Sequence, residues 1–153
     1  MGRKKRYMDK IELIMRNNKS KYPNQVVGNL GLFYVCYQLS RMGWNAMPTS
    51  RNAKGIDILI YSQDAKNKKA IQVKSLSRKN PIPLGNTNEL FCDFLVICRE
   101  VFKEPEIFVM EPIEIKDKIH KGVNKDGKNS YWLQPKDYEE FKNKWEKIGN
   151  GNN

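Results

Sequence analysis

Long hydrophobic runs are absent from this sequence of 153 residues. No stretch approaches the roughly 18 apolar residues that a helix needs to cross a bilayer, and the basic N-terminus does not lead into an apolar signal segment. The hydrophobic share of 39% and the mean hydropathy of −0.72 are typical of a polar globular protein. We therefore expect one folded domain over residues 1–153 with no membrane partner.

Histidine and cysteine are also scarce. The single histidine, His120, lies in a polar segment and predicts a solvated surface residue, which argues against hydrolytic chemistry based on histidine. Cys36, Cys92 and Cys98 are odd in number, lie in apolar stretches and have no Cys-x-x-Cys spacing. They predict reduced core thiols in a cytoplasmic protein and argue against a zinc site.

Negative charge is in short supply, because 17 Asp and Glu residues stand against 28 Lys and Arg and leave a formal net charge of +11. Such an excess favours a polyanionic partner, since neutralising phosphates releases counterions and supplies affinity for any sequence. A membrane surface would attract the same charge, but no strongly amphipathic basic helix supports that alternative. The four basic residues at 3–6 are expected to add electrostatic attraction only.

Hydrophobic periodicity divides the chain into helices and strands. Helices are predicted over residues 7–16, 24–42, 112–119 and 136–148, and strands over 44–47, 58–61, 70–74, 91–98 and 106–110. The continuous apolar character of 91–98 is typical of a strand that is buried on both faces. This order predicts an α/β fold in which a mixed central sheet of about five strands is flanked by helices.

The helix over 24–42 is apolar around much of its circumference, which indicates packing between other elements. Asn24 is expected to cap it and Gly43 to end it. Gly28 and Gly31 lack side chains, so we expect both to permit the close approach of a neighbouring element.

The remaining segments are predicted to be irregular. Residues 75–86 have little periodicity and are interpreted as an excursion from the sheet, and residues 120–130 as a flexible loop. The basic tail 1–6 and the terminal residues 149–153 are expected to be disordered.

Asp57 and two residues of the following strand carry the most specific pattern of the chain. Asp57 opens one strand-like run, and Gln72 and Lys74 end the next one, after a polar turn. Because strand side chains alternate between faces, Gln72 and Lys74 point the same way and Val73 points to the other layer. A β-hairpin would therefore bring one carboxylate, one amide and one ammonium group together.

In this arrangement the sequence resembles the PD-(D/E)XK phosphodiesterase superfamily, which includes restriction endonucleases, Holliday-junction resolvases and repair nucleases. The family places an Asp on one strand and Glu-x-Lys on the next. Asp57 followed by Gln72-Val73-Lys74 looks like the Mrr-like variant, in which Gln replaces the Glu. The resemblance covers about residues 28–109 and implies a restriction endonuclease-like fold whose strands two and three form the catalytic hairpin.

The resemblance implies a metal-dependent DNA endonuclease of restriction, resolvase or defence type. Asp57, the Gln72 side chain and the Val73 carbonyl would bind Mg²⁺ or Mn²⁺, and Lys74 would orient the attacking water or stabilise negative charge. Family members often carry a further Glu on the preceding helix, at a position that falls here on Leu32. Glu12 and Glu89 are candidates to replace that acid.

Basic and polar residues flank this set and are expected to position phosphates. They are Arg51 and Lys54 before Asp57, and Ser75, Arg78 and Lys79 after Lys74.

Two alternatives remain open for the residues of the hairpin. The first is a catalytically inactive nuclease-fold protein that binds nucleic acid as an accessory or regulatory module, because Gln72 and Leu32 each stand where an acid is expected. The second is a set of ordinary polar residues at strand ends. DNA is the expected partner with RNA as an alternative, and the resemblance alone implies a homodimer as an option.

Overall fold

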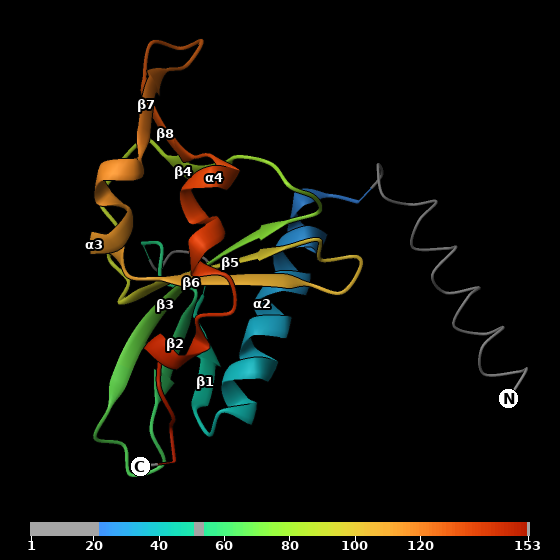
Figure 1. Cartoon of the computed structure of the whole chain (residues 1–153), viewed down its shortest axis with the longest axis vertical. Helices are drawn as coiled ribbons and strands as arrows, with labels where there is room; N and C mark the ends of the chain where they lie inside the picture. The colour runs from blue at the N-terminus through green and yellow to red at the C-terminus, as the bar shows by residue number, and fades with distance from the viewer. Residues whose placement is uncertain (1–21, 51–53, 153) are drawn as a thin grey trace, which may run out of the picture.

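The computed structural model describes residues 22–50 and 54–152 (Figure 1). Several predictions fall outside these residues, namely the helix over 7–16, the basic tail, Glu12 and Arg51.

Helix α2, Asn24–Arg41, lies along one face of the main sheet. Its buried positions Gly31, Val35 and Leu39 recur every four residues, so a narrow stripe of the helix faces the sheet. The helix is expected to pack between other elements, but among the described residues large side chains on its other sides are exposed. They are Leu30, Phe33 and Tyr37.

The ends of α2 follow the sequence in part. The helix begins at Asn24, but Pro23 occupies the capping position and no side chain caps the helix. The expected cap by Asn24 is therefore wrong. At the other end, Gly43 has φ +86°, a conformation that favours glycine, and the helix ends there as predicted.

The main sheet contains five strands in the order β1-β2-β3-β5-β6. These strands are Asn45–Pro48 (β1), Ile58–Tyr61 (β2), Lys68–Leu76 (β3), Phe94–Arg99 (β5) and Glu106–Met110 (β6). Strands β3 and β5 run parallel, and every other neighbouring pair is antiparallel. The predicted mixed sheet flanked by helices is confirmed. All residues of β5 are buried as expected, but the strand predicted over 91–98 begins only at Phe94, and Phe91 and Asp93 are exposed.

The main sheet separates two apolar cores. Val96 and Cys98 face the layer of α2, whereas Leu95 and Ile97 face the opposite layer. The opposite layer contains α3, Pro112–Ile115, which continues as a 3-10 turn over Lys116–Lys118 within the predicted helix 112–119. A core on each side explains why β5 has no polar face.

A second, three-stranded sheet forms from segments that the sequence predicts as irregular. It has the order β4-β8-β7 and is antiparallel, with β4 at Ile82–Gly85, β7 at His120–Val123 and β8 at Asn129–Leu133. The predictions of an irregular excursion over 75–86 and a flexible loop over 120–130 are therefore wrong in part. Pairing between distant segments stabilises these strands, and local sequence carries little of that information.

The predicted helix over 136–148 is broken into short pieces. Helix α4 spans Pro135–Tyr138, and 3-10 turns follow at Glu139–Phe141 and Trp145–Lys147. Asn143 lies between the two turns with φ +56°, which a continuous helix does not allow. Tyr138 and Phe141 are nevertheless buried against the main sheet, as their apolar spacing suggests.

The end of the chain has fixed partners. The indole Nε1 of Trp44 donates to the carbonyl of Gly149 at 2.9 Å, and the N–H of Gly151 donates to the carbonyl of Met42 at 3.0 Å. A Cβ on Gly151 would lie 2.6 Å from the backbone of Gly43, so only glycine allows this contact. The expected disorder of 149–153 is therefore not found over 149–152.

All three cysteines are free, with Cys92 and Cys98 buried and Cys36 half-buried, as predicted. In the part of the chain that the structure describes, no helix has the length and apolar character to cross a membrane.

Candidate functional site

The hairpin of β2 and β3 forms in the antiparallel register that pairs Ile58 with Ile71. Asp57 directly precedes β2, so it lies beside the part of β3 that continues past Ile71. The run 72–74 belongs to that part, and Val73 packs into the core on the α2 side as predicted. The structure thus brings together the two segments that the sequence pairs.

Asp57 is held by backbone hydrogen bonds in three directions. Its N–H donates to the carbonyl of Ile71 at 2.9 Å, and its carbonyl accepts from the N–H of Thr49 at 2.9 Å. Its side-chain Oδ2 accepts from the N–H of Val73 at 2.7 Å. Oδ1 takes part in no hydrogen bond among the described residues, so one oxygen of a fixed carboxylate is left for other ligands.

A cavity of about 240 Å³ opens between α2 and the end of this hairpin. Asp57, Val73 and Lys74 line it from the strands, and Leu32 lines it from the helix. Leu32 is the position at which the resemblance expects a Glu, and it does reach the same cavity as Asp57. The remaining lining residues are Asn24, Gly28, Asn29 and Ser75.

Asn24 and Asn29 are site residues that the sequence analysis missed. Asn29 precedes Leu32 by three residues, and residues three apart lie on the same face of a helix. Helix spacing from Leu32 is therefore a signal that points to Asn29. The two amides add polar groups to the helical wall of the cavity, where no carboxylate is found among the described residues.

Helix α2 lies very close to β3 at Gly31. A Cβ on Gly31 would lie 1.9 Å from the Oγ of Ser75, whereas a Cβ on Gly28 would meet nothing within 4 Å. The predicted role in close approach is therefore confirmed for Gly31 and wrong for Gly28. The Ser75 hydroxyl donates to the Gly28 carbonyl at 3.4 Å, so Ser75 links the helix to the strand.

Lys74 is half-buried beside Asp57. Burial lowers the pKa of the Lys74 ammonium group below its ordinary value of 10.5, and the negative charge of Asp57 opposes that shift. The buried thiol of Cys92 lies near the same lysine, and its own pKa is raised to about 11 by burial. Lys74 thus gives up its proton more readily than an exposed lysine does.

The side chain of Gln72 lies against the turn that precedes Asp57. A Cβ on Gly55 would lie 3.2 Å from the Gln72 Nε2, and Gly55 itself has φ +79°. Gln72 is not among the residues that line the cavity. The structure therefore brings Asp57, Val73 and Lys74 to the cavity and places the Gln72 amide beside Gly55.

The flanking residues named from the sequence have different surroundings. Lys54 and Arg78 are exposed. The ammonium group of Lys79 forms an ion pair with Glu139 at 2.9 Å. Arg51 lies outside the described residues.

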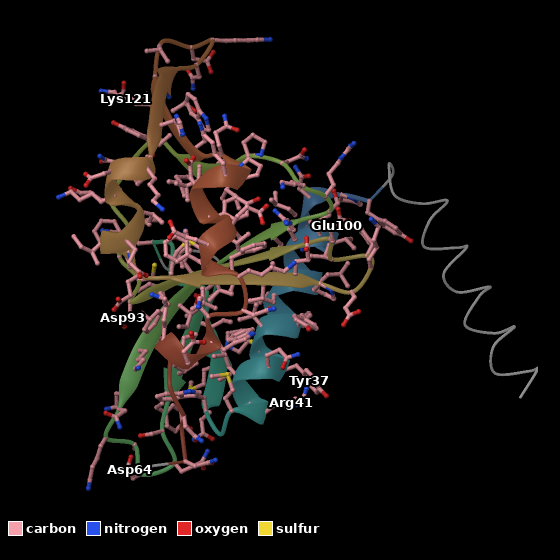
Figure 2. All side chains as sticks on the ribbon, viewed as in Figure 1. Tyr37, Arg41, Asp64, Asp93, Glu100 and Lys121 are labelled. Atoms are coloured by element: carbon pink, nitrogen blue, oxygen red, sulfur yellow. The ribbon has the colours of Figure 1, made fainter. Side chains whose placement is uncertain are left out.

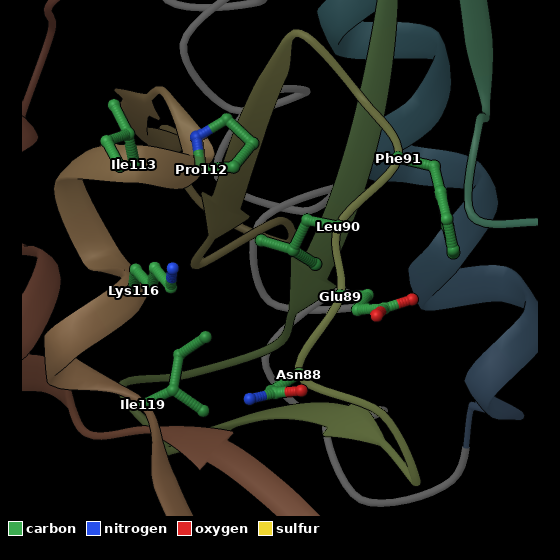
Figure 3. A pocket seen from close by; sticks show the side chains of 8 residues that line it. All are labelled: Asn88, Glu89, Leu90, Phe91, Pro112, Ile113, Lys116 and Ile119. Carbon is green, nitrogen blue, oxygen red and sulfur yellow. The ribbon is translucent and has the colours of Figure 1, made fainter.

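Glu89 lines a different cavity, of about 590 Å³, which shares no residue with the one at Asp57 (Figure 3). Its apolar wall includes Leu90, Phe91 and Ile113. Glu89 is therefore not among the acids that the structure brings to Asp57.

The donor set at Asp57 suits a hard cation only in part. Mg²⁺ binds through one or two carboxylates and completes its shell with waters and substrate phosphates. Asp57 and the Val73 carbonyl are hard oxygen donors, but Leu32 contributes none, and the described residues contain no group of three His, Cys, Asp or Glu side chains suited to a metal. At such a site, water and phosphate would have to supply the remaining ligands of a Mg²⁺ or Mn²⁺ ion.

Comparison with known proteins gives one structural relative to report. Neither the protein-family models nor the curated proteins match this sequence. The solved structure of a bacterial homing endonuclease is similar, with a TM-score of 0.53 and 14% identity over 83% of this chain and 93% of that chain. At this identity the likeness concerns the fold, and the chemistry has to be argued from the residues at Asp57.

Proposed function

We propose that this protein is a metal-dependent DNA endonuclease that hydrolyses phosphodiester bonds at the cavity of Asp57. The observation that carries the proposal is a carboxylate held by the Val73 N–H at 2.7 Å with Lys74 beside it. The net charge of +11 supports a polyanionic substrate. The fold shared with a homing endonuclease supports DNA as that substrate.

Asp57 and the Val73 carbonyl would hold a Mg²⁺ or Mn²⁺ ion, with the Gln72 amide as a third donor if its side chain turns away from Gly55. When bound, such an ion lowers the pKa of a water molecule and stabilises charge on the scissile phosphate. The chain's own part is to keep Asp57 in place, which the backbone bonds to Ile71 and Val73 do without side-chain rearrangement.

Lys74 would orient the attacking water or donate a hydrogen bond to a phosphate oxygen. Its lowered pKa makes the transfer of its proton easier than for an ordinary lysine. Exposed Lys54 and Arg78 would attract the phosphates on either side. Asn29 on the helical wall offers an amide to the same phosphate group.

Cleavage by the purified full chain tests the proposal. Plasmid, branched DNA and RNA are incubated with Mg²⁺ or Mn²⁺, and the variants Asp57→Asn and Lys74→Met are expected to cut at least about 100-fold more slowly. Asp64→Asn and Lys66→Met are matched controls, because both side chains are in the turn between β2 and β3 and do not line the cavity. Equal cleavage by all four variants, or none by the wild type, overturns the proposal.

A second candidate is a catalytically inactive module that binds nucleic acid. One observation favours it: Leu32 and the Gln72 amide leave Asp57 as the single carboxylate of the described cavity. Titration calorimetry separates the two candidates. Salt-sensitive DNA binding without any heat of Mn²⁺ binding favours the module, whereas Mn²⁺ binding that is lost in Asp57→Asn favours the endonuclease.

The type of endonuclease and the oligomeric state belong to the same proposal. Restriction, junction resolution and defence differ in the DNA that is cut, so the plasmid and branched substrates distinguish them. A homodimer would allow both strands to be cut, and sedimentation of the full chain with DNA measures it.

A further inference from the structure

The hairpin of β7 and β8 projects from the body at one end of the molecule (Figure 1). Strand β4 pairs with β8 only near its base, where the partners are residues 131–133. Beyond that point Gly122 pairs with Ser130 and Val123 with Asn129, and neither pair has a third strand beside it. The outer half is therefore a two-stranded ribbon.

The tip of this ribbon is held by its own hydrogen bonds. The N–H of Asn124 donates to the carbonyl of Lys128 at 2.8 Å, and the N–H of Gly127 donates to the carbonyl of Asn124 at 3.0 Å. The side-chain Oδ1 of Asn124 accepts from the N–H groups of Asp126 and Lys128 at 3.0 and 2.9 Å. Such a turn presents its side chains in one arrangement and loses little entropy on binding.

The base of the ribbon is anchored as well. The ring of His120 stacks on that of Trp132, with centroids 5.8 Å apart. The His120 side chain is 38% exposed, as predicted for a surface histidine, but its Nε2 also lies 2.9 Å from the Oδ2 of Asp137. These contacts fix the ribbon to α4.

The ribbon carries positive charge without matching acids. Lys121, Lys125 and Lys128 are exposed, and none of the ion pairs found among the described residues includes them. Asp126 is the acid at the tip. Val123 is 68% exposed and lies on the same face as Lys121, because strand residues two apart share a face.

We infer that this ribbon is an arm that enters the major groove of duplex DNA, an inference that rests on the proposed endonuclease function. The major groove of DNA admits a two-stranded β-ribbon. The phosphates of the two DNA strands border that groove, where Lys121, Lys125 and Lys128 could contact them. Val123 supplies an apolar contact of the kind that a thymine methyl group accepts, and Asn129 opposite it supplies an amide.

The sheet of the arm is linked to the site strand β3 by a short segment. Strand β4 starts six residues after Leu76, and six residues span at most about 20 Å. The ion pair between Lys79 and Glu139 and the bond from the Tyr138 hydroxyl to the Asn80 carbonyl at 3.4 Å hold this link.

Binding without cleavage tests the arm. Fluorescence anisotropy is measured with labelled duplex DNA and a metal chelator, in an Asp57→Asn background. Lys125→Ala combined with Lys128→Ala is expected to weaken binding at least about tenfold and to reduce the slope of log affinity against log salt by about 1.8. The matched control combines Lys66→Ala with Lys68→Ala, which removes the same charge at the far end of the molecule, near Asp64 (Figure 2).

The outcomes separate the arm from the endonuclease proposal. If the lysine pair on the arm and the control pair weaken DNA binding equally, with unchanged circular dichroism, the proposed role of the arm is wrong. The endonuclease proposal then still stands. If Asp57→Asn protein with an intact arm binds no DNA, the endonuclease proposal fails as well. Tighter binding of duplex RNA than of duplex DNA also overturns the arm, because the narrow major groove of RNA does not admit side chains.

Discussion

The carboxylate Oδ2 of Asp57 accepts a hydrogen bond of 2.7 Å from the backbone N–H of Val73. This bond ties the residue before β2 to the part of β3 that extends past the paired register. It therefore gives Asp57 a structural role in addition to the chemical one that we propose.

Substitution of Asp57 separates these roles. Asp57→Ala leaves the half-buried Val73 N–H without its partner, so we expect the free energy of unfolding to fall by about 1–3 kcal/mol. Asp57→Asn keeps a side-chain oxygen and should lose less than about 1 kcal/mol. Urea denaturation measures both, with Asp126→Ala at the exposed tip of the ribbon as a control. An equal loss of unfolding free energy in Asp57→Ala and Asp57→Asn would mean that the hydrogen bond from the Val73 N–H does not cause the loss.

Leu32→Glu is expected to strengthen metal binding. The substitution adds a second carboxylate to the cavity of Asp57, and carboxylate ligands raise affinity for hard divalent cations. Calorimetry should show Mn²⁺ affinity rising by about tenfold or more. Phe33→Glu is the matched control, because Phe33 is the next residue of α2 and is 62% exposed. A gain of the same size in Phe33→Glu would mean that charge alone, and not the position, is responsible.

The pKa of Lys74 should reflect two opposing influences, its burial and the nearby charge of Asp57. Its pKa lies below 10.5 in the folded protein, with burial as the larger cause, and Asp57→Asn should lower it further by removing the opposing charge. The folded state then binds fewer protons than the unfolded state between the two pKa values, so stability rises with pH in that window. NMR of labelled lysine side chains measures the pKa, and Lys74→Met should abolish the rise. A higher pKa in Asp57→Asn would contradict the expected geometry.

Two glycines of α2 should respond in opposite ways to alanine. A Cβ on Gly31 would lie 1.9 Å from the Ser75 Oγ, so Gly31→Ala is expected to cost about 1–3 kcal/mol through overpacking. Gly28→Ala has open space and should stabilise the helix by up to about 1 kcal/mol. Thermal and urea unfolding test both, and similar effects at the two positions would disprove the close contact at Ser75.

The stability of the protein should fall in acid through Glu106. Hydrogen bonds from Arg99 and then Lys142 lower the pKa of Glu106 from 4.5 to about 2. Because the folded pKa is the lower one, the stabilisation is complete above about pH 4.5 and is lost as pH falls towards 2. Arg99→Met should reduce this part of the pH dependence, as unfolding from pH 6 to 2 would show. Arg99 is 5% exposed, so the variant should also be less stable at neutral pH because two acids lose their partner.

Much of the site was predictable because its signals are local. Two short apolar runs with a polar turn between them specify the β2–β3 hairpin from local sequence alone. Helix spacing likewise places Leu32 on the side of α2 that lines the cavity, together with Gly28 and Asn29. The side-chain direction of Gln72 was not predictable, since it depends on the space that Gly55 leaves beside it.

The segments that were predicted wrongly depend on distant partners. Strand β4 pairs with β8, which lies 44 or more residues further along the chain. Pro81 just before the strand and Pro83 within it locally favour a loop. The predicted helix over 136–148 is interrupted at Asn143, whose N–H donates to the carbonyl of Ile107 on β6 at 2.8 Å. In both places a tertiary hydrogen bond outweighed the local preference.

The sequence by itself determined the mixed α/β class, the positive charge and the pairing of Asp57 with the run 72–74, because periodicity, composition and turns act over short distances. Only the tertiary structure decided that Val73 holds the Asp57 carboxylate, that α2 lies against Ser75 at Gly31, and that residues 120–133 form a projecting arm. These features arise from packing and hydrogen bonding between segments far apart in the chain, where the preference of each residue depends on its partner.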